Sequence, residues 1–250
     1  MDSLWSGLHC ASYFGIVEVV AALVEIGCYD LNEGDCFGST ALSLAAEAGH
    51  EEVVKILLGR EEVNPNTENK FGATPLSFAA IGGHEGIVKI LLGREEVNPD
   101  KPGSNGRPPL SDAAKEGHEG VVKILLRRDE VNPDKPDNDG RTPLSYAVHE
   151  GIVKILLGRD EVNPDKPDNR GRTPLSYAAW NGRQGMVKLL LGLEEVNPDK
   201  PDNNGRPPLS YAAVYGHQGV VKMQLGREGV NPNKPDREGQ IPLMYATRYG

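Results

Sequence analysis

Apolar residues along the chain gather in short clusters that are spaced like one face of a helix. One cluster predicts a helix over residues 184–191, with a broad apolar side formed by Met186, Val187, Leu189, Leu190 and Leu191. A shorter helix is expected just before it, from Pro174 to about Asn181. Its hydroxyl cap would be Thr173, and Pro174 suits the first helical position. Gly182 separates the two predicted helices.

A polar segment rich in turn-forming residues precedes each such pair. Residues 163–171 read Asn-Pro-Asp-Lys-Pro-Asp-Asn-Arg-Gly, which cannot continue a helix because proline lacks the amide donor. We expect this segment to form a short β-hairpin, called a finger below. One structural unit is therefore predicted to consist of a finger, a first helix, a turn and a second helix.

This unit repeats along the whole chain. The block Thr-Pro-Leu-Ser or a variant of it opens each predicted first helix. Its first residues are Ser6, Thr40, Thr74, Pro108, Thr142, Thr173, Pro207 and Ile241. Successive steps are 34 residues, except for a step of 31 between Thr142 and Thr173.

Helices this short are marginally stable in isolation, so neighbouring units have to stack. Composition agrees with such an elongated array. Hydrophobic residues make up 38% of the chain, and 30 Gly and 19 Pro indicate regularly placed turns. We therefore expect one all-α solenoid domain over residues 1–250, with about seven repeats and a truncated last one.

Charge and cysteine content narrow the possible partners and surroundings. A net charge of -9 argues against nucleic acid as a partner. The longest apolar stretch near the start, residues 16–26, contains Glu18 and Glu25, which argues against a signal peptide or a membrane span. Three cysteines lacking zinc-ligand spacing favour a reducing compartment, the cytoplasm or the nucleus.

The repeated motif resembles the ankyrin repeat family. Residues 74–80 read Thr-Pro-Leu-Ser-Phe-Ala-Ala and are followed by Gly83 and His84, as in the family pattern. The segment Glu-Val-Asn-Pro-Asp-Lys-Pro-Asp further resembles arrays in large multidomain proteins of filamentous fungi. The resemblance implies a stack of helix pairs whose first helices line a concave binding surface.

Positions that differ most between units lie at the end of each first helix, where the resemblance places that surface. Aromatic and long polar groups there are typical anchors of a protein interface. Neutral drift on an exposed face is the alternative. The candidate partner-binding residues are Tyr13, Phe14, Glu47, Ile81, Lys115, Glu116, Trp180, Asn181, Val214, Tyr215, Arg248 and Tyr249.

Charged and histidine residues recur at fixed positions, for which a structural role is favoured over a chemical one. The histidines are His9, which lies inside its unit's first-helix block, and the inter-helix residues His50, His84, His118, His149 and His217. A lysine ladder in the fingers, Lys101, Lys135, Lys166, Lys200 and Lys234, is expected to be a solvated edge. The arginines Arg107, Arg141, Arg172 and Arg206 form another ladder, which an acidic partner could use if the surrounding acids did not weaken it.

Two irregularities lie in adjacent units. The 31-residue step omits three residues after Val148, and Asp112 stands where other units carry Tyr146 or another large residue. We hypothesise a notch bordered by Asp112, Lys115 and Glu116 on one side and by Trp180 and Asn181 on the other. The alternative is a tolerated deletion, with Asp112 turned to solvent or paired with Lys115.

The sequence thus favours a protein-binding module or scaffold that needs no cofactor or metal. Catalysis or small-molecule binding at the notch is an alternative, as is a purely structural spacer. No phosphate loop, nucleophile elbow or metalloprotease motif occurs in the sequence. Because Leu243, Tyr245 and Ala246 lack a second helix behind them, we expect a fragment of a longer array or self-association at this end.

Overall fold

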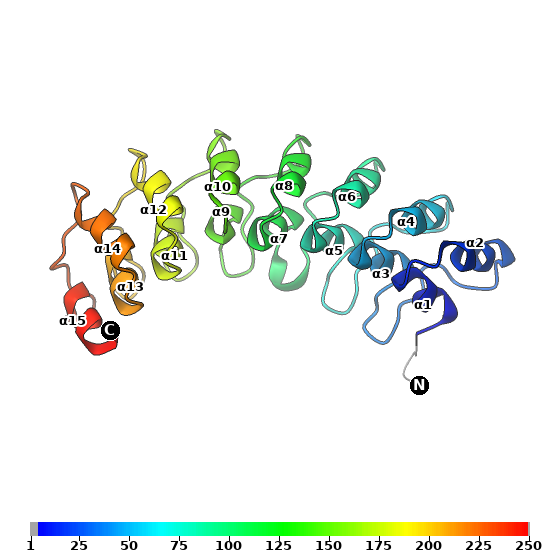
Figure 1. The fold of residues 1–250 in the computed structure, drawn as a ribbon, viewed down its shortest axis with the longest axis horizontal. Helices are drawn as coiled ribbons and strands as arrows, with labels where there is room; N and C mark the ends of the chain where they lie inside the picture. Colours follow the sequence, from blue (N-terminus) through cyan, green and yellow to red (C-terminus); the bar gives the residue numbers. More distant parts are fainter. Residues whose placement is uncertain (1–4, 250) are drawn as a thin grey trace. The chain divides into compact units, whose positions relative to one another are not determined.

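The computed structural model describes residues 5–249, without the side chains of Ser104, Arg248 and Tyr249. It divides into two compact units, residues 1–132 (unit 1) and residues 133–250 (unit 2), which are treated separately below (Figure 1). The expectation of one domain over the whole chain stays a prediction.

Unit 1 is a succession of helix pairs. The pairs are α1 (Gly7–Tyr13) and α2 (Val17–Ile26), α3 (Ala41–Ala48) and α4 (Glu51–Leu58), α5 (Pro75–Gly82) and α6 (Glu85–Leu92), and α7 (Pro109–Glu116) and α8 (Glu119–Leu125). A short 3₁₀ helix, η1 (Ser104–Gly106), lies in the finger before α7. Each first helix packs on the first helix of the next pair, as α1 does on α3.

Unit 2 continues the same alternation. Its elements are α9 (Pro143–Tyr146) and α10 (Glu150–Leu157), α11 (Pro174–Trp180) and α12 (Gln184–Leu191), α13 (Pro208–Val214) and α14 (Gln218–Leu225), and α15 (Pro242–Tyr249). The predicted second helix over 184–191 is confirmed. The predicted first helix begins at Pro174, as expected, and ends at Trp180, one residue before Asn181. None of the helices described in residues 5–249 is long and apolar enough to cross a membrane.

The first helices begin as their sequences dictate. The side chain of Thr74 accepts a hydrogen bond from the amide of Ser77 at 3.2 Å, and Thr40, Thr142 and Thr173 cap their helices in the same way. Proline occupies the first position of α5, where the missing amide hydrogen removes no helical bond.

Part of the core is a row of leucines that recur at one position of every first helix before α15. These leucines are at most 2% exposed, and they are Leu8, Leu42, Leu76 and Leu110 in unit 1 and Leu144, Leu175 and Leu209 in unit 2. Their shared burial between neighbouring units is what a solenoid requires, because each repeat has apolar neighbours only in the adjacent repeats. The predicted all-α solenoid is confirmed.

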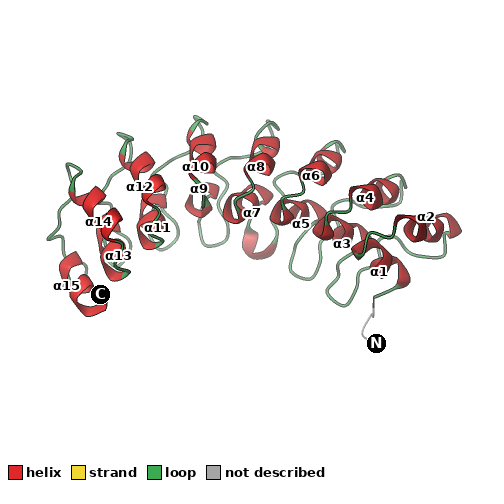
Figure 2. Ribbon diagram, in the orientation of Figure 1, coloured by secondary structure: helices red, strands yellow, loops and turns green. Residues whose placement is uncertain are grey.

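The fingers differ from the expected β-hairpins. Among the described residues no strand forms, and one isolated antiparallel bridge joins Gly34 to Thr40 (Figure 2). A side-chain turn closes the finger instead: Oδ1 of Asp168 accepts hydrogen bonds from the amides of Arg170 and Arg172 at 2.9 and 2.8 Å. The amide of Asp168 also donates to the carbonyl oxygen of Arg172 at 2.9 Å, so carboxylate and main-chain bonds close the turn together.

The three-residue deletion shortens α9 to four residues, whereas the other first helices of unit 2 have seven or eight. Ala147 leaves the helical conformation with a ψ of 121°, and His149 directly precedes α10. Arg183 donates from Nη1 to the carbonyl oxygen of Ala147 at 2.6 Å. A side chain of the following repeat thus caps the shortened helix.

Candidate partner-binding surface

The predicted anchors of unit 1 stand at the ends of the first helices. Phe14 is 65% exposed, Ile81 and Glu47 are exposed, and Tyr13 is just over one third exposed. Lys115 and Glu116 are exposed as well, and they form an ion pair of 2.7 Å with each other. These side chains lie on successive first helices that pack side by side, so unit 1 presents them along one line of helix ends.

Histidines hold the main chain at these anchor positions. Nε2 of His50 bonds the carbonyl oxygen of Tyr13 at 2.9 Å, and His84 and His118 bond Glu47 and Ile81 in the same way at 3.0 and 2.8 Å. In unit 2, His217 bonds the carbonyl oxygen of Trp180 at 2.9 Å. Each histidine therefore fixes the anchor of the preceding repeat, a relationship that sequence spacing alone does not show.

Each of these histidines packs on a glycine of the preceding repeat, where both the backbone conformation and the lack of space for a Cβ require glycine. Gly83 ends α5 with a φ of 73°, in the left-handed region, and a Cβ there would lie 2.5 Å from Nδ1 of His118. His118 thus packs directly on the glycine that follows Ile81 and Gly82 in the chain. The Gly–His pair keeps the two repeats in close contact behind the anchor.

The ring of His9 bonds main-chain groups through both of its nitrogens. Its Nδ1 accepts from the amide of Ser6 at 3.2 Å, and its Nε2 bonds the carbonyl oxygen of Glu33 at 3.0 Å. Both ring nitrogens are therefore committed to main-chain groups. Within the described residues, no group of three potential ligands could hold a metal ion.

An aromatic cluster lies at the first helix of unit 1. Trp5 and Tyr13 have ring centroids 5.1 Å apart, and Tyr13 meets Phe14 edge-on at 5.4 Å. The indole of Trp5 also donates to Oδ2 of Asp35 at 3.0 Å. Trp5 was missed as a site residue, although a tryptophan next to two predicted aromatic anchors is the signal that points to it.

A second aromatic cluster centres on Trp180 in unit 2. Its ring stacks with those of Tyr211 and Tyr215 on the next first helix, at centroid distances of 5.5 and 5.6 Å and interplanar angles of 11° and 15°. Tyr215 is half exposed, and Asn181 beside Trp180 is exposed. Two predicted anchors from adjacent repeats, Trp180 and Tyr215, therefore meet in one cluster.

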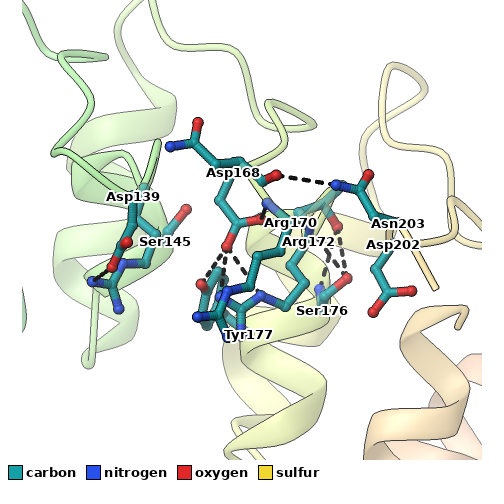
Figure 3. Close-up of polar contacts among 12 residues, drawn as sticks. Asp139, Ser145, Asp168, Arg170, Arg172, Ser176, Tyr177, Asp202 and Asn203 are labelled. Atoms are coloured by element: carbon teal, nitrogen blue, oxygen red, sulfur yellow. Dashed lines mark hydrogen bonds and ion pairs between the residues drawn. The ribbon is translucent and has the colours of Figure 1, made fainter.

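Each finger of unit 2 is joined to its own first helix by an Asp–Tyr hydrogen bond. The hydroxyl of Tyr177 donates to Oδ2 of Asp168 at 2.6 Å (Figure 3). Tyr211 donates to Asp202 at 2.6 Å. Tyr146 and Tyr245 bond Asp137 and Asp236 in the same manner. This pairing holds the finger at a fixed position over the helix that bears the anchors.

These hydrogen bonds set the protonation of the pair. Burial alone would raise the pKa of Asp168, but hydrogen bonds from Tyr177 and Arg172 outweigh it and hold the pKa below its ordinary value. Burial and the hydrogen bond to Asp168 raise the pKa of the Tyr177 phenol. The tyrosine therefore stays a donor and the aspartate an acceptor at neutral pH.

The lysine ladder joins fingers rather than forming the expected solvated edge. Nζ of Lys200 bonds both the carbonyl oxygen and Oδ2 of Asp165, one finger earlier, at 2.8 and 3.0 Å. Lys166 and Lys234 pair with the equivalent Asp134 and Asp199. The lysine side chains are 31–33% exposed and their carboxylate partners 11–12%, so partial burial strengthens these ion pairs.

The arginines are arranged differently from finger to finger. Arg141 bonds Asp137 at 3.2 Å and Asp139 at 2.6 Å, so two carboxylates neutralise it. Arg172 bonds Asp168 alone, because Arg170 occupies the tip position that Asp139 holds in the preceding finger (Figure 3). A hollow of about 200 Å³ is lined by Arg170, Arg172 and Arg206 together with residues of the Trp180 cluster.

Asp112 is neither turned to solvent nor paired with Lys115, as the tolerated-deletion alternative supposed. Its side chain is 6% exposed and bonds Nη1 of Arg107 at 3.0 Å, and Lys115 pairs with Glu116 instead. Burial raises the pKa of Asp112 to about 6, although the Arg107 guanidinium acts in the opposite direction.

The remaining predicted residues lie as follows. Tyr146 ends the shortened α9 and is partly exposed, and Val214 is a partly exposed residue at the end of α13 beside the 200 Å³ hollow. The side chains of Arg248 and Tyr249 lie outside the described part of the chain. The notch between Asp112 and Trp180 stays a prediction, since it joins residues of the two units.

An apolar hollow of about 570 Å³ lies in unit 2 among α13, α14 and α15, with Leu209, Leu225 and Leu243 in its lining. Leu225, at the end of α14, and Leu243, in α15, are exposed. Self-association at this surface stays a prediction.

Comparison with known proteins identifies the family of the repeated helix pairs. The profile described as "Ankyrin repeats (3 copies)" matches residues 2–69, 59–137, 129–200 and 184–250. Over 53 residues the chain is 47% identical to a human protein named "Photoreceptor ankyrin repeat protein". Those residues are 21% of this chain and 12% of that protein, so the chain matches a small part of its length. Since the profile covers nearly every residue, the chain belongs to the ankyrin repeat family.

Proposed function

We propose that this chain is a protein-binding module that recognises its partner through the ends of its first helices and its fingers. Ankyrin repeats are generally protein–protein interaction modules. The arrangement described above suits that role, because variable side chains stand on a main chain that the repeat itself holds in place.

The observation that carries the proposal is the Trp180–Tyr215 pair. Both are predicted anchors, they come from different repeats, and their rings stack at 5.6 Å. The main chain of Trp180 is held by His217, and its ring stacks with both tyrosines and lies 5.6 Å from the Arg172 guanidinium. A preformed aromatic surface of this kind binds with little loss of side-chain freedom.

Catalysis is not part of the proposed function. The residue that best suited a proton-transfer role, Asp112, has a side chain only 6% exposed and bonded to Arg107. A general acid or base has to reach its substrate within hydrogen-bond distance, and this carboxylate faces its own finger instead. Neither a cofactor nor a metal enters the proposed mechanism.

Affinity capture tests the proposal. The parent chain and a variant carrying Trp180→Ala and Tyr215→Ala are immobilised and exposed to the same cell lysate, and bound proteins are identified by mass spectrometry. We expect proteins retained by the parent to be lost from the variant. Far-ultraviolet circular dichroism and thermal unfolding of both chains control for folding. Identical captures by two folded chains would contradict this assignment of the anchors.

A further inference from the structure

We propose that the hollow between Arg172, Arg206 and Trp180 binds one anionic side chain of a peptide segment, either a carboxylate or a phosphate. The inference rests on the proposed protein-binding function and states which kind of side chain the partner contributes. It concerns a single site within unit 2, not an electrostatic track along the fingers.

The size of the hollow suits one side chain. Its volume of about 200 Å³ lies below the range of about 300–1,000 Å³ that holds a drug-sized small molecule. Its lining includes three arginines, Arg170, Arg172 and Arg206, together with the rings of Trp180 and Tyr215. A side chain with an apolar stem and a charged end matches this combination.

Arg172 and Arg206 are ion-paired with Asp168 and Asp236, so the positive charge at this point comes from Arg170, although the whole chain carries a net charge of -9. Asp202 is the one acidic residue in the lining, and it is already committed. Its Oδ1 accepts from the amides of Asn204 and Arg206 at 2.8 Å each, and its Oδ2 accepts from the hydroxyl of Tyr211 at 2.6 Å. The carboxylate is therefore directed into its own turn and leaves the arginines to face the hollow.

The arginines retain donors for a ligand. Arg172 uses Nε and Nη2 on Asp168, and within the described residues its Nη1 makes no hydrogen bond. Nε of Arg206 is buried without a hydrogen-bond partner and lies 3.6 Å from Oδ2 of Asp236. The exposed Arg170 guanidinium forms no ion pair with any residue that the structure describes. An oxyanion in the hollow would give Nη1 of Arg172 and the Arg170 guanidinium an acceptor.

The neighbouring fingers show why the site is local. The tip position held by Arg170 is occupied by Asp139, Asn204 and Glu238 in the other fingers of unit 2, and Asp139 neutralises Arg141. A nucleic-acid backbone would bring several phosphates past these acids, whereas one side chain meets only the arginines. This favours a peptide as the source of the anion.

The test uses three synthetic peptides that differ only at the central residue. They are acetylated and amidated pentapeptides of alanine with a central glutamate, phosphoserine or glutamine. Binding to the full chain is followed by the NMR signals of the tryptophan indoles and of the arginine Nε–H groups. The chain has two tryptophans, so Trp5 in unit 1 serves as an internal reference for Trp180.

We expect the glutamate or phosphoserine peptide to shift the Trp180 signal in a saturable way and to leave that of Trp5 unchanged. The glutamine peptide should bind about tenfold more weakly or not at all. Arg170→Gln should raise the Kd about fivefold, whereas Arg237→Gln, an equal charge change two fingers further along and outside the hollow, should not. The tighter of the two anionic peptides identifies the carboxylate or the phosphate as the preferred group.

Equal binding of the glutamine peptide, no shift of Trp180 with either anionic peptide, or equal effects of Arg170→Gln and Arg237→Gln would overturn the inference. The two proposals fail separately. If Trp180→Ala with Tyr215→Ala abolishes capture of a protein while Arg170→Gln with Arg206→Gln retains it fully, the protein-binding function stands and the anion site does not.

Discussion

The carboxylate of Asp112 accepts a hydrogen bond from Nη1 of Arg107 at 3.0 Å, across the finger that precedes its helix. In the fingers of unit 2 the acidic residue stands nine positions earlier and bonds a tyrosine at the position of Asp112. The equivalent earlier position in this repeat is Gly103. In this repeat the carboxylate therefore stands on the helix, not in the finger, and its partner is an arginine of the finger.

This relocation predicts strong coupling between two substitutions. Asp112→Tyr alone should destabilise unit 1, because the new hydroxyl would lack a carboxylate and Arg107 would lose Asp112. Adding Gly103→Asp should restore an Asp–Tyr pair, so that the double variant is more stable than the sum of the single effects by about 1–2 kcal/mol. Urea unfolding of the four chains measures this coupling energy.

One contact limits the second substitution. A Cβ at Gly103 would lie 3.1 Å from Oγ of Ser77, so Gly103→Asp by itself should be mildly destabilising. Gly103→Ala is the matched control, since it adds the Cβ without the carboxylate. If the stability changes of Asp112→Tyr and Gly103→Asp were simply additive, as expected for Asp112→Tyr with Gly103→Ala, the proposed exchange of carboxylate positions would be contradicted.

Asp112 should also make stability depend on pH. Burial raises its pKa to about 6 from 3.8, so the native state holds this proton more tightly than the unfolded chain does. The associated stabilisation is present at low pH and is lost as pH rises through about 6. Relative to Asp112→Asn, the parent should lose about 2–3 kcal/mol of unfolding free energy between about pH 4 and about pH 7. Parallel pH profiles of the two chains would show that the carboxylate is not shifted.

The Gly–His contacts predict different costs for two glycine substitutions with similar backbone angles. Gly216 has a φ of 65° and open space where an added Cβ would stand, whereas a Cβ at Gly83 would meet His118 at 2.5 Å. Gly216→Ala should cost about 1 kcal/mol from conformation alone, and Gly83→Ala about 2 kcal/mol or more. Thermal and denaturant unfolding of both variants separates strain from the clash; equal costs would rule the clash out.

The notch hypothesis has its own test. Three residues inserted after Val148 should lengthen α9 towards the seven residues of α11. If the deletion serves binding, affinity for a captured partner should fall while the unfolding temperature does not. Isothermal titration calorimetry with the parent as reference measures this, and unchanged affinity would remove the notch from the proposed surface.

Much of the fold could be predicted from local chemistry. Thr173 caps α11, Gly182 separates the helices, and the apolar side of residues 184–191 forms α12, because each of these effects acts within a few residues. The same reasoning failed at the fingers. Asp168 closes its turn with side-chain bonds, so no strand pairing is needed.

Contacts between distant residues were the harder part of the site. Trp180 was predicted as an anchor, but its stacking on Tyr211 and the position of Arg172 over its ring depend on how adjacent repeats are rotated. The Asp–Tyr pairs could have been predicted from a regular spacing in the sequence. Tyrosine follows aspartate by nine residues in each finger of unit 2, while Asn69 is followed by Phe78, which has no hydroxyl.

The bonds that the inter-helix histidines and the finger lysines of unit 2 make to other repeats run the same way. His217 reaches back to Trp180, and Lys200 and Lys234 reach back to Asp165 and Asp199. Every such repeat offers acceptors to its successor and directs donors to its predecessor. A repeat copied in tandem would therefore find complementary groups on both sides, so gene duplication can lengthen the array in a single step without leaving these polar groups unpaired.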